Sequence, residues 1–186
     1  SVTQALSNER GEFTLWLPEG SYMLVSSDII RTSLTDPVEL ALPADAERRL
    51  EFRVASPAVA ALHVSPEGTT EPVPCKVRFL GINGTPDPDL GPLYARRTRN
   101  VVYLAHGAES VEVPAGDYTI IANRGIEYHM TSVTVSLKRN QVTPVELKLT
   151  RAWDAGGMVS GDFHLHMENS FDSAVSLEDR VISAAG

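Results

Sequence analysis

Two histidines that could bind a metal ion, His164 and His166, stand near the end of the sequence, and Asp172 follows six residues after the second. Apolar and polar residues alternate over 160–166, which predicts a strand with Asp162 and both histidines on one face. Residues on one face of a strand lie roughly 6.5 Å apart, so the two imidazoles can lean onto one divalent ion, or onto two neighbouring ions, at about 2.0 to 2.1 Å. The carboxylate of Asp172 would add an oxygen ligand. The pattern therefore predicts a metal site with three ligands, His164, His166 and Asp172.

The same residues have a plainer interpretation, which is a surface strand with solvated imidazoles and an ordinary loop carboxylate at Asp172. A pair of histidines two residues apart also arises by chance in many sequences. The order of the surrounding elements favours the metal site, because the loop after the strand leads into a helix. The residues Ser176-Leu177-Glu178-Asp179 are typical of a capping box at the start of such a helix.

The segment from Gly161 to His166, together with Asp172 and the helix start that follows, resembles the first motif of the PHP (polymerase and histidinol phosphatase) metallohydrolase family. It is most similar to the CehA/McbA-like branch, in which this motif follows β-sandwich modules. The resemblance covers about residues 157 to 186. It implies that His164, His166 and Asp172 are metal ligands in a distorted (β/α)7 barrel that hydrolyses phosphate esters with a cluster of divalent ions (Zn, Mn or Fe).

The resemblance also implies that the later strands of such a barrel, which carry the remaining ligands, are not in this sequence. We expect residues 153–186 to form its first strand and helix, and we expect no turnover from this chain alone. About 30 residues cannot bury enough surface to offset the entropy of ordering them. The residues from Gly156 onward should therefore be mobile, be held at a sandwich edge, or be bound by a neighbour. Three ligands without a closed cavity hold an ion weakly, so tight metal binding is expected only in the full-length enzyme.

The composition of the 186 residues, 42% hydrophobic and 22% charged, is ordinary for a folded globular protein. The chain has 16 basic and 24 acidic residues and a net charge of −8. This balance argues against general binding to nucleic acid, because such binding depends on neutralising phosphates. No apolar run approaches the roughly 18 residues that cross a bilayer, so no membrane span is expected. Cys75 is the sole cysteine, so no disulfide can form within the chain.

A repeat organises the chain before the histidines. The segment Leu17–Met23 recurs as Val113–Thr119, and each copy is followed by a matching segment, Glu51–Val54 or Glu146–Leu149, which is expected to be a strand. In each copy proline starts a turn, glycine permits a positive φ, and tyrosine begins the next strand with its ring inward and its hydroxyl able to reach a polar partner. The repeat predicts two related units, each with a hairpin corner at this motif.

The predicted fold is all-β. Alternating apolar residues predict about seven strands in the second unit, residues 56–152, which is enough for a small β-sandwich. The first unit, residues 1–55, has room for about four strands. We therefore expect two consecutive small β-sandwich units, the first incomplete, followed by the short βα tail of residues 153–186 that begins a barrel domain. The seven strands are expected near Val59–Val64, Val73–Phe79, Asn100–Ala105, Ser110–Val113, Tyr118–Asn123, Val133–Leu137 and Val145–Leu149.

The first copy of the repeat, Gly11–Tyr22, resembles the carboxypeptidase regulatory-like, or transthyretin-like, sandwich domains, and Pro114–Tyr118 is similar to a more divergent member. This resemblance implies that the first unit lacks its first two strands. An open sheet edge would result, and it favours strand exchange or a homo-oligomer at that edge. This pattern indicates a fold but gives almost no information about function.

Other residues give weaker signals. Three arginines follow a long loop, namely Arg96, Arg97 and Arg99. Three interpretations stay open: they bind an anionic substrate group, they brace a catalytic domain, or they simply face water. The remaining histidines have no close partners in sequence and are expected to be hydrogen-bonded packing residues; they are His63, His106 and His129.

Three functions stay open. In the first, the sandwiches are the non-catalytic region of a metal-dependent PHP-type phosphoesterase, their partner is the catalytic domain downstream, and the resemblance favours a secreted, periplasmic or envelope location. In the second, they are a binding or adhesive module for carbohydrate, cell wall or protein, which needs an exposed aromatic platform. Trp16 is the only tryptophan of the sandwiches and gives such a platform little support. In the third, they are a spacer.

Overall fold

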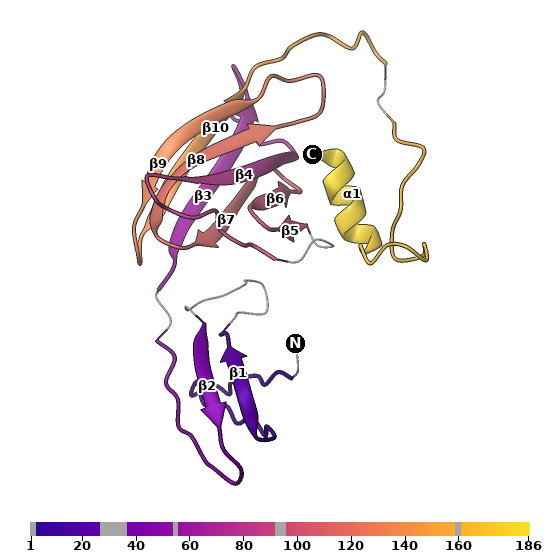
Figure 1. The fold of residues 1–186 in the computed structure, drawn as a ribbon. Coiled ribbons are helices and arrows are strands. Elements are labelled where there is room, and N and C mark those ends of the chain that lie inside the picture. The colour runs from indigo at the N-terminus through magenta and orange to yellow at the C-terminus, as the bar shows by residue number, and fades with distance from the viewer. Residues whose placement is uncertain (1–2, 27–36, 54–55, 92–95, 159–160) are drawn as a thin grey trace.

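The computed structural model describes residues 3–26, 37–53, 56–91, 96–158 and 161–186. Within these ranges the chain is all-β, as predicted, with one short helix, α1 (Leu177–Ala185). Figure 1 shows a β-sandwich with α1 beside it and a separate hairpin formed by β1 (Gly20–Leu24) and β2 (Val38–Leu42). No helix in the described part of the chain is long and apolar enough to cross a membrane.

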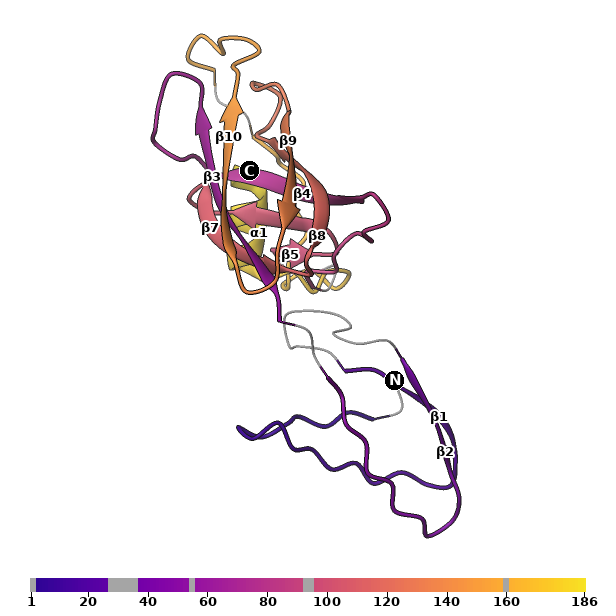
Figure 2. The same ribbon diagram turned by 90° about the vertical axis from the view of Figure 1, so that its left-hand side faces the viewer.

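The sandwich consists of two sheets (Figures 1 and 2). In the three-stranded sheet β3 (Ala58–Pro66) lies in the centre, parallel to β10 (Val142–Leu149) and antiparallel to β7 (Ala108–Val113). The other sheet is antiparallel and has the order β5-β6-β4-β8-β9. Its strands are β4 (Cys75–Ile82), β5 (Arg97–Thr98), β6 (Val101–Leu104), β8 (Gly116–Asn123) and β9 (Thr131–Leu137).

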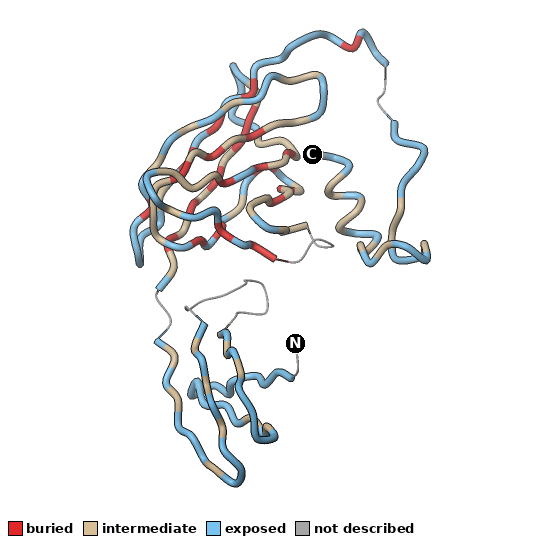
Figure 3. Tube along the Cα trace, in the orientation of Figure 1, coloured by how far each residue is buried: buried red, intermediate tan, exposed pale blue. Residues whose placement is uncertain are grey.

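Alternating apolar residues build the core, because every second side chain of a strand points to the same face of its sheet. Figure 3 shows the buried residues concentrated in the strands of the sandwich. Phe79 and Tyr118 are fully buried there, and their rings meet edge to face at a centroid distance of 6.1 Å. Burying each large apolar side chain stabilises the fold by about 1.5 to 3 kcal/mol. All seven strands expected in the second unit are present, and only the two-residue β5 was not expected.

The repeat forms a tyrosine corner in both units, but the predicted hairpin at the motif is wrong. The strands on either side of the second copy, β7 and β8, belong to different sheets, and residues 12–17 before the first copy form no strand. The hydroxyl of Tyr118 donates a hydrogen bond to the carbonyl oxygen of Pro114 at 2.9 Å. The hydroxyl of Tyr22 donates in the same way to the carbonyl oxygen of Pro18, at 2.7 Å. In each case the tyrosine side chain folds back over the turn that precedes its own strand. The hydrogen bond ties the beginning of that strand to the residue four positions earlier.

The two hairpins that follow these corners also share their strand register. Both pairs are antiparallel, and the glycine and the tyrosine of the motif take equivalent partners in each. Gly20 pairs with Leu42 as Gly116 pairs with Leu137, and Tyr22 pairs with Leu40 as Tyr118 pairs with Val135. The β1–β2 hairpin is therefore a structural copy of β8–β9.

The expected role of glycine in the motif holds for only one copy. Gly20 has a φ of +155°, whereas Gly116 is not among the residues with positive φ. Gly116 is required for space, because a Cβ there would lie 2.4 Å from Cγ2 of Thr85. The second copy of the motif keeps its glycine because of a close contact with the loop after β4.

The strand expected over 51–54 is wrong for Glu51–Arg53, and Val54 lies outside the described residues. Its counterpart in the second unit belongs to β10, which forms its backbone hydrogen bonds with β3. In the described part of the first unit no strand takes the place of β3. A segment with strand-like composition stays irregular when it has no neighbour to pair with.

The strand expected over 160–166 is also wrong. Ser160 lies outside the described residues, and 161–166 contain no strand. Among the described residues no strand pairs with this segment, and Phe163, on the face opposite the histidines in the predicted strand, is fully exposed. The βα tail therefore keeps its helix but not its strand.

The helix α1 is capped, as predicted, by Ser176, whose Oγ accepts a hydrogen bond from the backbone N–H of Asp179 at 3.1 Å. The helix contacts β6, and Gly186 lies so close to Cys75 that a Cβ would be 2.7 Å from the Cys75 carbonyl carbon. None of the residues 161–186 is buried. The prediction that the tail has no core of its own is confirmed, and α1 is held against the end of the sandwich.

Candidate metal centre

The segment that carries the two histidines is shaped by local hydrogen bonds. A carboxylate oxygen of Asp162 accepts the backbone N–H of His164 at 3.0 Å, which turns the chain as aspartate side chains do in Asx turns. Nε of Arg180 donates to the carbonyl oxygen of His166 at 2.8 Å. Because Arg180 belongs to α1, this bond attaches the histidine segment to the helix.

The two imidazoles lie side by side, as the sequence predicted, although no strand places them there. Nε2 of His164 is 2.8 Å from Nε2 of His166, and the rings stack with centroids 4.8 Å apart and planes 26° apart. Two nitrogens bound to one ion at about 2.0 to 2.1 Å would stand about 2.9 to 3.4 Å apart, depending on the angle at the metal. The Nε2 atoms therefore need to separate by only a few tenths of an ångström to share an ion.

Asp172 contacts the opposite edge of the His166 ring. Its Oδ1 lies 2.8 Å from Nδ1 of His166, and this hydrogen bond holds the pKa of the Asp172 carboxyl below its ordinary value. The loop that carries Asp172 is closed by a backbone hydrogen bond from Glu168 to the carbonyl of Val175 at 2.7 Å. The structure thus brings all three predicted ligands together, but it places Asp172 on His166 and not beside the two Nε2 atoms.

The hydrogen bonds indicate which nitrogens are available to a metal. A neutral His166 that donates its Nδ1 proton to the carboxylate of Asp172 keeps a lone pair on Nε2. His164 then supplies the proton between the two Nε2 atoms, and it must change tautomer to become a ligand. A carboxylate on the far nitrogen is the usual partner of a metal-bound histidine, so this donor set fits a divalent ion. Asp172 as a direct ligand stays a prediction.

The cluster is open to solvent. The side chains of His166 and Asp172 are 44% and 42% exposed, and Phe171 next to Asp172 is fully exposed. Within the described residues no three side chains of His, Cys, Asp or Glu are arranged to hold one metal ion. The geometry is therefore that of two nitrogen donors and one orienting carboxylate.

The arginine loop gives no support to an anion site. Nη1 of Arg96 lies 3.4 Å from Oε2 of Glu109, and Arg97 forms a closer ion pair with the same carboxylate. The Glu109 side chain is only 20% exposed, and both guanidinium groups are paired with its largely covered carboxylate. Their arrangement explains how β5 is attached to β7.

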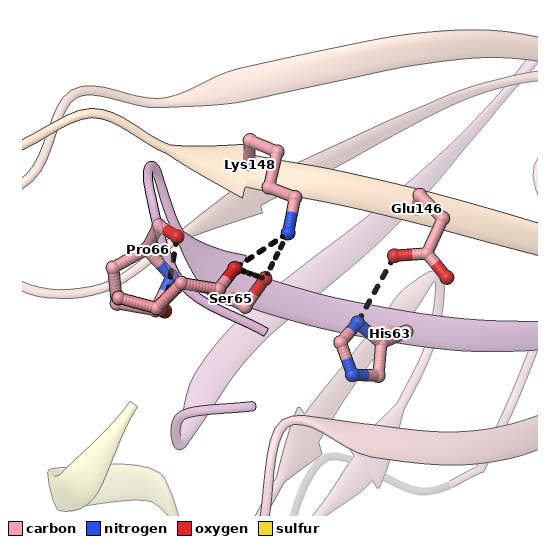
Figure 4. A network of polar contacts seen from close by, with 6 residues as sticks. His63, Ser65, Pro66, Glu146 and Lys148 are labelled. Carbon is pink, nitrogen blue, oxygen red and sulfur yellow. Dashed lines mark hydrogen bonds and ion pairs between the residues drawn. The ribbon is translucent and has the colours of Figure 1, made fainter. Parts of the chain in front are cut away.

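Sequence reasoning did not find a polar network on the outer face of β3 and β10 (Figure 4). Nδ1 of His63 lies 3.0 Å from Oε2 of Glu146, which agrees with the expected hydrogen-bonded packing role of this histidine. Nζ of Lys148 donates to Oγ of Ser65 at 2.7 Å and to the carbonyl oxygen of Thr69 at 2.8 Å. The lysine binds both acceptors and thereby fastens the turn after β3.

This Ser65–Lys148 pair is not arranged as a nucleophile and base. Ser65 is fully buried, and its hydroxyl lies 3.3 Å from the Thr69 carbonyl oxygen. The pair follows from the parallel register of β3 and β10, in which Lys148 lies opposite Ser65 and Glu146 lies opposite His63. The sequence predicted which residues of each strand point outward, but it did not predict which residues of β3 lie opposite those of β10.

Comparison of the chain with protein-family models, with curated proteins and with solved structures found no match.

Proposed function

We propose that the chain carries the first metal-ligand segment of a PHP-type phosphoesterase and that the sandwich over 56–152 supports this segment. His164 and His166 would hold a divalent ion through their Nε2 atoms, with Asp172 as orienting carboxylate or third ligand. The observation that carries the proposal is the convergence of these three side chains through two successive contacts of 2.8 Å. Nothing in regular secondary structure forces them together.

Each residue of the cluster has a defined task in this proposal. Asp172 accepts the proton at Nδ1 of His166 and so leaves Nε2 free to bind. Arg180 holds the backbone of His166 through its carbonyl oxygen, which ties the ligand to α1. A bound divalent ion would supply Lewis-acid activation of a phosphate ester and of water.

The open geometry limits what these residues do alone. Two exposed nitrogen donors and one carboxylate leave most of the coordination sphere of an ion to other groups. We propose that the catalytic domain of the same protein provides the remaining ligands and encloses the substrate. The described residues then act as a non-catalytic support that presents one edge of the centre.

Isothermal titration calorimetry with Zn²⁺ and Mn²⁺ tests the proposal on this chain. We expect weak binding by the wild type and none by the double variant His164→Ala/His166→Ala. The matched control is His106→Ala, which removes an exposed histidine outside the cluster and should bind like the wild type. Equal heats for the wild type and the double variant would contradict the proposal.

A further inference from the structure

The first unit repeats half of the second. Because β1–β2 copies β8–β9 in register and in its tyrosine corner, the flanking segments also correspond. Residues 12–17, before the first corner, correspond to β7, and Glu51–Arg53 correspond to the part of β10 around Leu147. The strands β7 to β10 of the second unit thus have counterpart segments in the first.

Four strands of the second unit, β3 to β6, have no counterpart segment in the described part of the first, and two of them pair with strands that do have counterparts. The first is β3, which lies between β7 and β10 and pairs with both. The second is β4, which pairs antiparallel with β8 on the side away from β9, so that Phe79 lies opposite Ile120. The ring of Phe79 also packs against Tyr118, the tyrosine of the corner.

Both places are empty of strands in the described part of the first unit. β1 pairs with β2 alone, and neither 12–17 nor 51–53 forms a strand. No residue of 3–26 or 37–53 is buried, whereas Val111, Val113 and Tyr118 of the second unit are fully buried. The equivalents Leu15 and Leu17 remain half-exposed. As far as 3–26 and 37–53 show, the first unit thus presents an unpaired sheet edge and an uncovered apolar face.

We infer that the first unit is an acceptor for two consecutive β-strands of a partner polypeptide segment. One strand would insert between 12–17 and 51–53, as β3 does between β7 and β10. The other would pair antiparallel along the free edge of β1, as β4 does along β8. Recognition would combine main-chain hydrogen bonds with pockets for every second side chain, as in other cases of strand addition.

The second unit also indicates the chemistry of the inserted strand. The inward residues of β3 are small or branched and apolar, namely Ala58, Ala60, Leu62 and Val64, and all are buried. The partner strand should carry the same alternation. The aromatic contact between Phe13 and Phe52, with ring centroids 5.9 Å apart, joins the two segments that would flank it, and these rings must separate on binding.

A second copy of this chain cannot fill both places. Its own β3 and β4 are locked in the core of its sandwich, where Val64, Val77 and Phe79 are fully buried. Pairing β1 with β1 of a second copy would cover the edge but would leave 12–17 and 51–53 without the strand between them. The partner is therefore a separate strand-forming segment with the β3–β4 pattern.

The test supplies the two strands from the chain's own repeat. An extra copy of residues 57–83, which contain β3 and β4, is fused ahead of the chain through a flexible Gly/Ser linker. Amide hydrogen exchange is then followed by mass spectrometry. We expect exchange in 12–17, 20–24 and 51–53 to slow at least about tenfold relative to the unfused chain. Exchange in β8 reports that the second unit stays folded.

The matched control carries Leu62→Asp and Val64→Asp in the extra copy only, and it should leave exchange in the first unit unchanged. Equal exchange in the two fusions would overturn the inference. The peptide of residues 57–83 added to the unfused chain repeats the test if a fusion does not fold, with the same expected slowing. Sedimentation of the unfused chain tests whether a second copy is the partner. A dimer with slow exchange in 20–24 would mean that a second copy occupies the edge, and it would also overturn the inference.

Discussion

Nδ1 of His166 lies 2.8 Å from a carboxylate oxygen of Asp172, while Nε2 of the same ring faces His164. In a neutral imidazole this relationship assigns the proton to Nδ1 and the lone pair to Nε2. The exposed carboxylate of Asp172 thereby orients the His166 ring, although the loop that carries Asp172 contains no regular secondary structure. The contribution of Asp172 to metal binding can be separated from that of the histidines by substitution.

Asp172→Ala removes the acceptor for the His166 proton. We expect the affinity of the chain for Zn²⁺ to fall about 10- to 100-fold, as for other losses of an orienting partner. Asp172→Asn keeps an oxygen that can accept from Nδ1 and should lose less. Calorimetric titration measures both, with Glu178→Gln, an acidic residue of α1 outside the cluster, as the control. Unchanged affinity in Asp172→Ala would mean that this carboxylate has no part in the site.

Tyr118 should make the stability of the sandwich sensitive to alkaline pH. Burial raises the pKa of its hydroxyl from 10 to about 12, with a smaller contribution from the negative charge of Asp87. The neutral form is favoured in the folded state, so the associated stability is complete below pH 10 and is lost as pH rises through about 12.

We expect the free energy of unfolding of the wild type to fall over this alkaline range and that of Tyr118→Phe to fall less. At neutral pH, Tyr118→Phe should cost about 1 kcal/mol, because its hydrogen bond to Pro114 is lost. Tyr22→Phe loses the matching bond in a unit without a buried core and should cost less. Urea unfolding at several pH values measures all three proteins. Parallel pH profiles for wild type and Tyr118→Phe would contradict this expectation.

Cys75 should be inert toward thiol reagents in the folded protein. It is fully buried at the start of β4, and burial raises the pKa of its thiol to about 12, an effect that the nearby charge of Arg124 only partly opposes. At pH 8 almost none of the thiol is then ionised, and the thiolate is the reactive form. We expect labelling by a maleimide only in denaturant, and rapid labelling of the native chain would show that this end of the sandwich opens.

Gly107 and Gly84 separate two reasons for a glycine. Both have positive φ, +71° and +83°. A Cβ at Gly107 would lie 2.3 Å from the carbonyl oxygen of Val73, whereas a Cβ at Gly84 would meet open space. We expect Gly84→Ala to cost about 1 kcal/mol for backbone strain and Gly107→Ala about 3 kcal/mol, because overpacking against main-chain atoms adds to the strain. Equal costs in urea unfolding would contradict the close contact.

Local patterns predicted the elements of the sandwich well. The alternation of Cys75, Val77 and Phe79 identified β4, and Ser176 marked the start of α1, because these signals depend on neighbouring residues. The parallel pairing of β3 with β10 was not predictable, since no local signal connects Ser65 with Lys148 across most of the domain. The networks on that face follow from this pairing.

The two wrong strands have one physical cause. Glu51–Arg53 and residues 161–166 have alternating sequences, but a strand forms only when a neighbour accepts its backbone hydrogen bonds, and no neighbouring strand lies beside them in the described part of the chain. The proximity of the three candidate ligands was nevertheless predicted by residue type and spacing. His164, His166 and Asp172 converge through side-chain hydrogen bonds, which depend less on the backbone conformation than the predicted strand did.

Zinc K-edge X-ray absorption of the Zn²⁺-loaded chain, compared with His164→Ala/His166→Ala, addresses the metal centre most directly. We expect a first shell that contains imidazole nitrogens at about 2.0 to 2.1 Å in the wild type, and loss of this imidazole contribution in the variant. A spectrum without imidazole in the first shell, or one that the two substitutions leave unchanged, would contradict the assignment of His164 and His166 as metal ligands.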